Sequence, residues 1–406
     1  MPFKFSSKEI HFLKSESDDR NVSAPDRYYT DLLLSKSEQV LSFEKRLEDA
    51  EIPGDSFLCA VLKVSEDISD TLVEKVRTAF ETTFNHFLNH DRGLWETIED
   101  TAFALAFWDY GSEERAVELI RSLKDRLSKA LNTDILAGVA LFPFHDFSET
   151  DTFENAVKAM DHAAFFGPDS LIRFDSVSLN ISGDRFYQLQ EIDRAMQDYV
   201  KGLEITPKDI NLINSLGVCY GVTGELELAR KEFERANQLN PGEVMVLYNI
   251  ALLHRIDDNP DKAEIYLKKA HAIDDRTFEV ELLLGRLLFS DDRTDQAFPH
   301  LERAAGINPD SAAAHRMIGE ILLSDKDEEN AAAAFNRAIK LNPSDAVSLS
   351  GYARCLDIQE KNLQIALSFA RNSVALEPDN ALFKRRLESI REKIEGPAEQ
   401  TPAKSA

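Results

Sequence analysis

Hydrophobic and polar positions follow two different patterns along this chain. Between about residues 181 and 378, apolar side chains recur three or four residues apart within segments of helical length, so each segment has one apolar stripe. Before residue 175, short apolar runs of strand length alternate with helical patterns. The chain is therefore predicted to combine a mixed α+β first half with an all-α second half.

The helical half repeats with a step of 34 residues. Small residues, large residues and helix-ending prolines follow this step, with Asp275 in one proline slot: Ala195, Ala229, Ala263, Ala297 and Ala331; Tyr199, Phe233, Leu267, Leu301 and Phe335; Pro207, Pro241, Pro309 and Pro343. Small side chains are expected where two helices approach most closely, and proline stops a helix because it cannot continue the hydrogen-bond ladder. The step predicts pairs of antiparallel helices.

This period and these residues resemble the tetratricopeptide (TPR) repeat, a helix-turn-helix unit of 34 residues. The resemblance implies a superhelical solenoid of six repeats over residues 181–378. The amphipathic segment 379–395, which contains "KRR" and "REK", suits the polar capping helix that such arrays require. The small, polar residues 396–406 are predicted to be a disordered tail.

The first half is predicted to form one domain after a disordered segment, residues 1–27. A helix is expected over residues 28–51, as a linker that could pair with itself in a homodimer. Strands and helices then alternate through residues 55–175. The expected strands are 57–64, two within 93–108, 135–142 and 171–174, and the expected helices are 70–89, 113–131 and 152–166. This order contains the split βαββαβ unit of ferredoxin-like palms.

Residues 55–175 resemble the GGDEF (diguanylate cyclase) domain. The strand "ILAGVALFP" at 135–143 and the helix "AVKAMDHAAFFG" at 156–167 match that family at Gly138, Ala140, Pro143 and at Ala156, Ala159, Ala163 and Gly167. The resemblance implies a ferredoxin-like/GGDEF-like palm, and with it a bacterial origin and a place in signalling.

The residues that carry the chemistry of that family are missing. At the signature turn the chain has "EDTAF" (99–103), without the glycine pair that lets the backbone approach a nucleotide. Lys63 and Ser65 stand where a metal-binding carboxylate is expected, and Ala164 replaces a phosphate-binding lysine. The inhibitory Arg-x-x-Asp motif of that family is absent, because the residue three positions after Arg92 is Trp95 and not an aspartate. The domain is therefore predicted to be degenerate, with no catalytic residues and no enzymatic activity. The alternative is a c-di-GMP or GTP sensor, or a residual diguanylate cyclase, with a TPR arm.

No metal or cofactor is predicted. Glu66, Asp67, Glu99 and Asp100 could form an unconventional cation site, but solvated loop carboxylates are the expected explanation. His86 and His90 lie one helical turn apart and could share a metal, although two ligands do not complete a zinc site.

Composition limits the possible partners and the location. The net charge of −25 disfavours binding to a nucleic acid, and no apolar run is long enough for membrane insertion. Cys59, Cys219 and Cys355 lie far apart among apolar neighbours, which suits free thiols in a reducing cytoplasm. The N-terminus has no hydrophobic secretion signal, so a cytoplasmic protein is expected.

The TPR resemblance places a partner-binding groove on the first helix of each repeat. Carried onto this sequence, the groove residues are Asn214, Tyr248, Leu252, Arg255, Leu282, Arg286, Phe289, Arg316 and Arg354. Arginine and aromatic residues are enriched at binding hot spots, and arginine pairs carboxylates, so a protein or peptide partner with acidic character is expected. In the alternative, these arginines pair with Glu279, Glu320 and other neighbours. The lysines and asparagines of the chaperone-type carboxylate clamp are absent. The expected function is a non-catalytic, cytoplasmic scaffold or adaptor.

Overall fold

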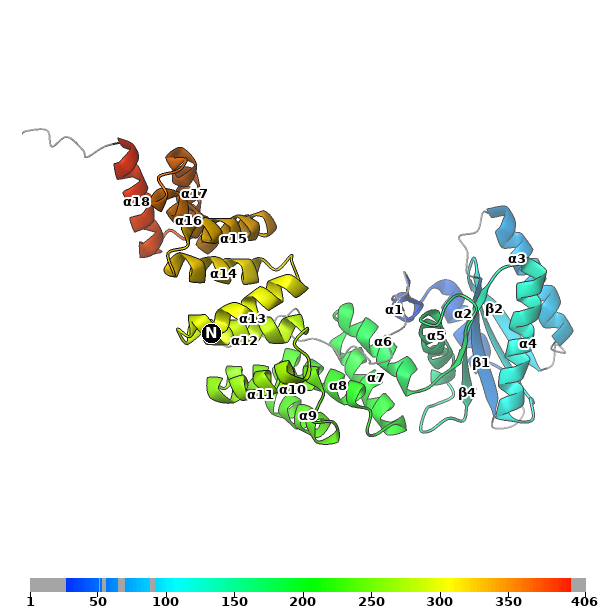
Figure 1. Cartoon of the computed structure of the whole chain (residues 1–406). Helices are drawn as coiled ribbons and strands as arrows, with labels where there is room; N and C mark the ends of the chain where they lie inside the picture. The colour runs from blue at the N-terminus through cyan, green and yellow to red at the C-terminus, as the bar shows by residue number, and fades with distance from the viewer. Residues whose placement is uncertain (1–26, 51, 53–55, 65–69, 88–91, 396–406) are drawn as a thin grey trace, which may run out of the picture. The chain divides into compact units, whose positions relative to one another are not determined.

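The computed structural model describes residues 27–50, 52, 56–64, 70–87 and 92–395. Of the predicted disordered segments 1–27 and 396–406, all residues except Arg27 lie outside the described residues. The chain divides into two compact units, Met1–Asn240 and Pro241–Ala406. This boundary falls between the second and third helix pairs and not at residue 175. The first two helix pairs thus belong to the same compact unit as the sheet. Figure 1 shows the elements of the chain in order.

The first unit is built on a five-stranded sheet in the order β2-β3-β1-β4-β5. The strands are β1 (Phe57–Val64), β2 (Gly93–Glu99), β3 (Ala102–Trp108), β4 (Ile135–Phe142) and β5 (Leu171–Arg173). The central strand β1 pairs antiparallel with β3 and with β4, and the short edge strand β5 runs parallel to β4. The elements from β1 to β4 follow the predicted βαββαβ order.

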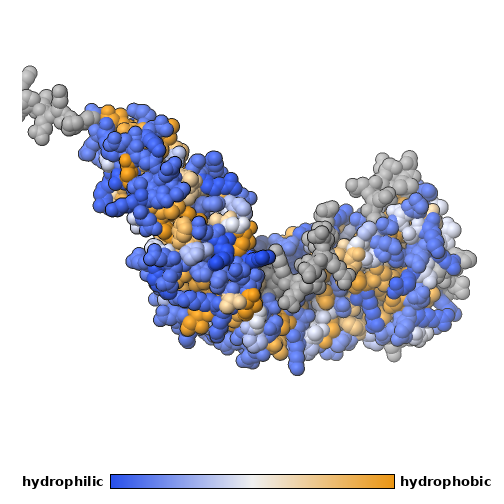
Figure 2. Space-filling model, viewed as in Figure 1, coloured by the Kyte–Doolittle hydropathy of each residue, from blue (hydrophilic) through white to orange (hydrophobic). Residues whose placement is uncertain are grey.

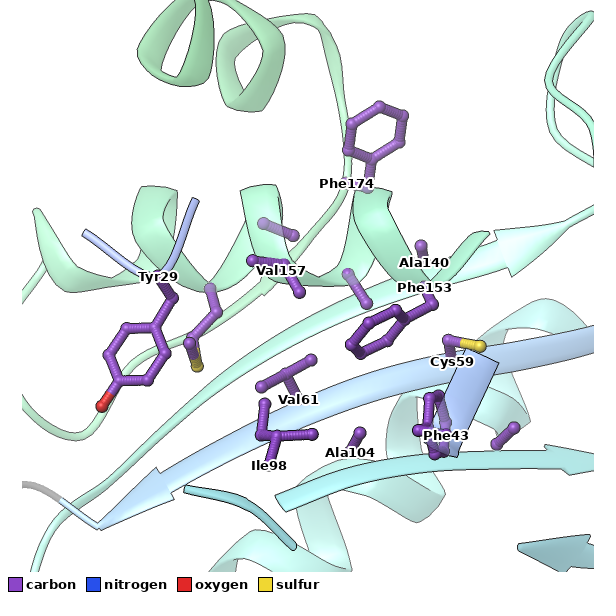
Figure 3. Close-up of a cluster of buried hydrophobic side chains, with 14 of the residues drawn as sticks. Tyr29, Phe43, Cys59, Val61, Ile98, Ala104, Ala140, Phe153, Val157 and Phe174 are labelled. Carbon is purple, nitrogen blue, oxygen red and sulfur yellow. The ribbon is translucent and has the colours of Figure 1, made fainter. Parts of the chain in front are cut away.

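Both faces of the sheet are covered. On one face, α3 (Asp70–Phe87) and α4 (Glu113–Leu131) belong with a core that includes Leu58 and Leu62 of β1. The alternate residues of β1, such as Cys59 and Val61, point into a second core shared with α5 (Asp151–Ala164), as Figure 3 shows. Because both faces are buried, β1 is apolar at nearly every position, as its sequence "FLCAVLKV" records.

The segment predicted as one linker helix forms two short helices inside this domain. The helices α1 (Asp31–Ser35) and α2 (Glu38–Glu48) are separated by Lys36, which has a positive φ of 39°, and by Ser37, whose side chain accepts a hydrogen bond from the amide of Val40. The apolar side chains of the segment pack into the sheet core: Leu32, Leu33, Val40, Phe43 and Leu47. A homodimer through residues 28–51 would need that same apolar face, which is already covered within the chain.

A buried carboxylate holds the start of this segment. Asp161 on α5 is 1% exposed and accepts hydrogen bonds from the amides of Tyr29 and Thr30, each at 2.7 Å, and from the Thr30 hydroxyl at 2.6 Å. Burial raises the pKa of Asp161 to about 6, although these three donors work in the opposite direction. Residues 28–50 are therefore packed as a part of the sheet domain.

Helix pairs follow the sheet. In the first unit they are α6 (Ser176–Gln188) with α7 (Ile192–Ile205) and α8 (Ile210–Thr223) with α9 (Leu226–Leu239). In the second unit they are α10 (Val244–Ile256) with α11 (Pro260–Ile273), α12 (Phe278–Ser290) with α13 (Thr294–Ile307), α14 (Ala312–Ser324) with α15 (Glu328–Leu341), and α16 (Ala346–Ile358) with α17 (Leu363–Leu376); α18 (Ala381–Glu395) follows. The array begins five residues before the predicted residue 181, because Asp175 and Ser178 cap α6 reciprocally.

The 34-residue step has a direct structural cause. A Cβ atom at Gly217 would lie 2.7 Å from the Phe233 ring, and one at Gly319 would lie 2.9 Å from the Phe335 ring, so only glycine fits at these contacts between paired helices. The turn between the two helices of each pair contains one residue with positive φ, again at 34-residue steps: Gln190, Gly224, Asp258, Asp292, Lys326 and Glu360. The last pair has one additional residue, and Asn362 also takes a positive φ there.

The first helix pair is joined to the sheet domain through buried charges. Lys158 of α5 lies 2.6 Å from a carboxylate oxygen of Asp198 on α7, and both side chains are almost fully buried. Arg185 of α6 forms two hydrogen bonds with Asp31 of α1, at 2.8 and 2.6 Å. Helix α5 also packs along α6. These contacts explain why the first repeat and the sheet form one compact unit.

Candidate protein-binding surface

The first helices of successive repeats form one layer in the second unit. Helix α12 contacts α14, α14 contacts α16, and α16 contacts α18. Side chains that project from the same face of these helices therefore lie on one continuous surface. Figure 2 shows apolar side chains interspersed among polar ones on the visible face of this unit. Eight of the nine predicted groove residues belong to the second unit, and Asn214 belongs to the first.

Three predicted groove residues are buried. Asn214 of α8 is 0% exposed, and Tyr248 and Leu252 of α10 are 5% and 3% exposed. Side chains with so little free surface contribute to packing and leave almost no area for a partner. Contact of these three residues with a partner stays a prediction, which their burial does not favour, because the repeat register does not determine how closely neighbours cover a side chain.

The inner positions of α12 and α14 remain partly open. Leu282, Arg286 and Phe289 lie four and three residues apart on α12, so they share one face of that helix, and all three are half-buried. The corresponding positions on α14 are also half-buried: Ala313, Arg316, Glu320 and Leu323. We call the seven residues on these two adjacent helices the open stripe. It combines large apolar side chains with two arginines. The remaining predicted residue of α10, Arg255, is half-buried as well.

The predicted groove arginines Arg316 and Arg354 are paired inside the chain. Arg316 lies 3.6 Å from a carboxylate oxygen of Asp345, and Arg354 lies 2.5 Å from a carboxylate oxygen of Asp357. Asp357 is fully buried and also forms an ion pair with Lys393 at 2.7 Å. The alternative in which the arginines pair with neighbouring carboxylates is thus realised for these two, and the charge of Arg316 also acts on Glu320. Their positive charge is partly neutralised before any partner arrives.

Helix α18 contributes a polar side chain that the repeat register did not place on this surface, Arg386. Arg386 of α18 donates a hydrogen bond to the hydroxyl of Ser350 at 3.0 Å. Burial, and then the nearby charge of Arg354, lower the pKa of Arg386, whereas burial raises the pKa of Glu320 on α14. The spacing of Arg386 and Lys393, seven residues apart on one helix face, is the signal that could have placed both on the inner side of the cap.

The sheet domain gives no support for a nucleotide site among its described residues. Glu99, at the turn before β3, is ion-paired with Arg27. The Lys63 ammonium lies 4.9 Å from the centre of the Tyr29 ring, so a cation occupies the end of β1 where a metal carboxylate would be needed. Ser65, Glu66, Asp67 and His90 lie outside the described residues, as does the side chain of His86, so those candidate sites remain predictions.

One residue behind the GGDEF resemblance has a packing explanation. A Cβ atom at Gly138 of β4 would collide with the backbone of α5 at Ala156 and Met160. Helix and strand therefore touch through glycine at this point. Such a requirement belongs to any fold with this close helix-to-sheet contact, so the match at Gly138 does not by itself imply nucleotide chemistry.

A family comparison matches a part of the helical half. Residues 282–346, which contain the open stripe, match the family model of the tetratricopeptide repeat. The match begins in α12 and ends in α16, and the helix pairs on either side continue the same step. No curated protein matches the chain in sequence.

Several solved structures resemble about half of the chain in outline. YrrB, described as a TPR protein with an unusual peptide-binding site, is 18% identical over 47% of this chain and 97% of its own, with a TM-score of 0.42. PilF of Pseudomonas aeruginosa is 18% identical over 52% of this chain and 95% of its own, with a TM-score of 0.48. PilW, described as a type IV pilus biogenesis factor, is 16% identical over 52% of this chain and 98% of its own, with a TM-score of 0.43.

The length and apolar character of the helices bear on the prediction about membrane insertion. Within the part of the chain that the structure describes, none of the helices has both the length and the apolar character required to span a bilayer.

Proposed function

We propose that this protein is a non-catalytic scaffold whose TPR half holds a protein or peptide partner on the open stripe of α12 and α14. The supporting observation is the partial exposure of the inner positions on these two adjacent helices, whereas Asn214 of α8 and Tyr248 and Leu252 of α10 are buried. A half-buried aromatic residue flanked by leucine and arginine offers apolar contact area and directional hydrogen bonds together, which is the composition of binding hot spots.

The partner is expected to meet the stripe chiefly through Leu282, Arg286 and Phe289. Arg316 already has a carboxylate neighbour, so an acidic group of the partner would compete with Asp345 for it. Acidic character in the partner is therefore a secondary feature of the proposal, and the apolar contact is primary. Since the three cysteines are free and buried, a reducing cytoplasmic setting fits the proposal.

The sheet domain is proposed to act as a structural partner of the first repeats and not as an enzyme. Its buried contacts from Lys158 and Asp161 fix it to α7 and to residues 28–51. The nucleotide-sensor or cyclase alternative has no supporting observation at the Glu99 turn. Formation of appreciable c-di-GMP from GTP and Mg²⁺ by the purified chain would reinstate that alternative.

Site-specific crosslinking tests the proposal with little change of shape. A photoreactive benzophenone amino acid in place of Phe289 should crosslink a partner protein in native extract, because that ring lies on the open stripe. The matched control places the same group at Phe298, a half-buried phenylalanine on the second helix α13 of the same repeat. Products from position 289 and none from position 298 are expected. Equal products from both positions, or products from 298 alone, would contradict the placement of the site.

A further inference from the structure

Three side chains from consecutive helices of the second unit converge on one point. Glu281 of α12 is fully buried, and its two carboxylate oxygens face two different histidines. Nδ1 of His271, at the end of α11, lies 2.5 Å from Oε1, and Nδ1 of His300, on α13, lies 2.8 Å from Oε2. The two imidazole rings are 4.9 Å apart between centres and nearly perpendicular. The histidines are separated by 29 residues in the sequence, which is why their spacing indicated no site.

The geometry suits a small transition-metal ion. The three candidate ligand atoms all lie within 4.8 Å of one another. Zinc binds histidine nitrogen and carboxylate oxygen at about 2.0–2.2 Å, so tetrahedral ligands are roughly 3.3–3.6 Å apart. Small side-chain rotations that open the two N···O distances by about 1 Å would produce this spacing. The imidazoles are 28% and 15% exposed, so they have room to turn and leave a path from solvent.

The chemistry of the donors selects the class of ion. Two imidazole nitrogens and one carboxylate are a preferred set for Zn²⁺ and for related ions such as Co²⁺ and Ni²⁺, whereas Mg²⁺ and Ca²⁺ prefer an all-oxygen shell. Two histidines with one glutamate leave a fourth position for water. From this arrangement we propose that His271, Glu281 and His300 bind one Zn²⁺ ion per chain.

The competing explanation is a hydrogen-bonded cluster without metal. Burial opposes the charged form of Glu281, but the two imidazoles outweigh it and hold the pKa of this carboxyl below its usual value. Arg303 also approaches, with Nη1 at 3.2 Å from Oε2. A single buried carboxylate thus has three donors around it. The metal proposal requires Arg303, whose side chain is 39% exposed, to give up its contact with the oxygen that the ion takes. The arginine is therefore a competitor of the ion.

Metal binding would fasten the second helix of one repeat to both helices of the next. Glu281 precedes Leu282, the first residue of the open stripe on α12. The ion would hold the start of this helix against α11 and α13, so it would stabilise the second unit independently of whether a partner binds.

Calorimetric titration of the full, untagged, EDTA-treated chain with Zn²⁺ tests the site, with visible absorption of Co²⁺ as a second readout. We expect one ion per chain with Kd of about 10 µM or tighter, and a thermal midpoint that rises with free Zn²⁺. The double variant His271→Ala/His300→Ala should lose at least about tenfold in affinity, since each histidine supplies a ligand. His315→Ala, a half-buried histidine of α14 whose Nε2 lies 3.0 Å from the carbonyl oxygen of Pro309, should bind as the parent does.

The variant Arg303→Met separates the two explanations even where the double variant folds poorly. It removes the competing cation and leaves all three ligands, so Zn²⁺ affinity should rise severalfold. Absence of Zn²⁺ binding by the parent chain at 100 µM or so would overturn the proposal, as would equal binding by parent and double variant. Either result would leave the cluster as a hydrogen-bonded network.

Discussion

Side chains at equivalent positions of the helical repeats are buried in α8 but half-buried in α12 and α14. Asn214, Val218 and Gly221 of α8 are buried, whereas the residues 68 positions later, Leu282, Arg286 and Phe289, are half-buried. In the first unit the preceding helix α6 packs against α8. The difference teaches that the repeat specifies how two helices pair, while the exposure of the inner face depends on the side chains and neighbours of each repeat.

Exchanging the side chains of two equivalent positions should produce the largest difference in stability between the two regions. Asn214 and Arg316 occupy the same place in their repeats, 102 residues apart. Asn214→Arg forces a charge into a fully buried site and should lower the free energy of unfolding of the first unit by about 3 kcal/mol or more. Arg316→Asn removes one half-exposed ion pair and should cost no more than about 1 kcal/mol.

Urea denaturation of both variants, followed by far-ultraviolet circular dichroism, measures the two costs. Similar losses from the two substitutions would show that the inner positions of these repeats are equally buried in solution. In that event the distinction between the closed α8 and the open stripe would be wrong.

The first unit should also carry a pH dependence that comes from Asp161. Its pKa of about 6 in the folded chain lies above the ordinary aspartate value, so the folded state takes up a proton before the unfolded state does. The stabilising contribution is fully present below about pH 4 and is lost as the pH rises to about 6. The complete loss of this contribution should amount to about 3 kcal/mol.

The measurement compares the parent chain with Asp161→Asn between pH 4 and pH 8, because other carboxyl groups titrate in both proteins and cancel in the difference. The variant is expected to lose stability overall, as the amide cannot accept from all three donors of Tyr29 and Thr30, yet to show a flatter dependence on pH. Parallel curves for the two proteins would mean that Asp161 keeps an ordinary pKa when folded.

The sequence predicted most of the elements because their causes are local or periodic. The bounds of β1, β4 and α4 agree with the predicted ranges, since apolar runs and capping residues mark them. The 34-residue step follows from contacts such as that between Gly319 and Phe335, which recur in every repeat where a small and a large residue face each other. Such features can be read without knowledge of distant neighbours.

The rest depended on contacts between distant segments. The break at Lys36 and the burial of Phe43 result from packing against α5, more than 100 residues later. The ion pair between Asp357 of α16 and Lys393 of α18 joins two helices whose relative position no local pattern gives. The convergence of His271, Glu281 and His300 likewise arises only when three helices are assembled.

The central claim is that the open stripe of α12 and α14 binds the partner, and the affinity of stripe variants tests it most directly. The partner captured through position 289 would be titrated against the full chain with Arg286→Glu/Arg316→Glu and against Arg371→Glu, an exposed arginine on the second helix α17. The account predicts that Kd rises at least about tenfold for the double variant and stays unchanged for the control. Equal affinity of all three proteins, with the double variant folded, would contradict it.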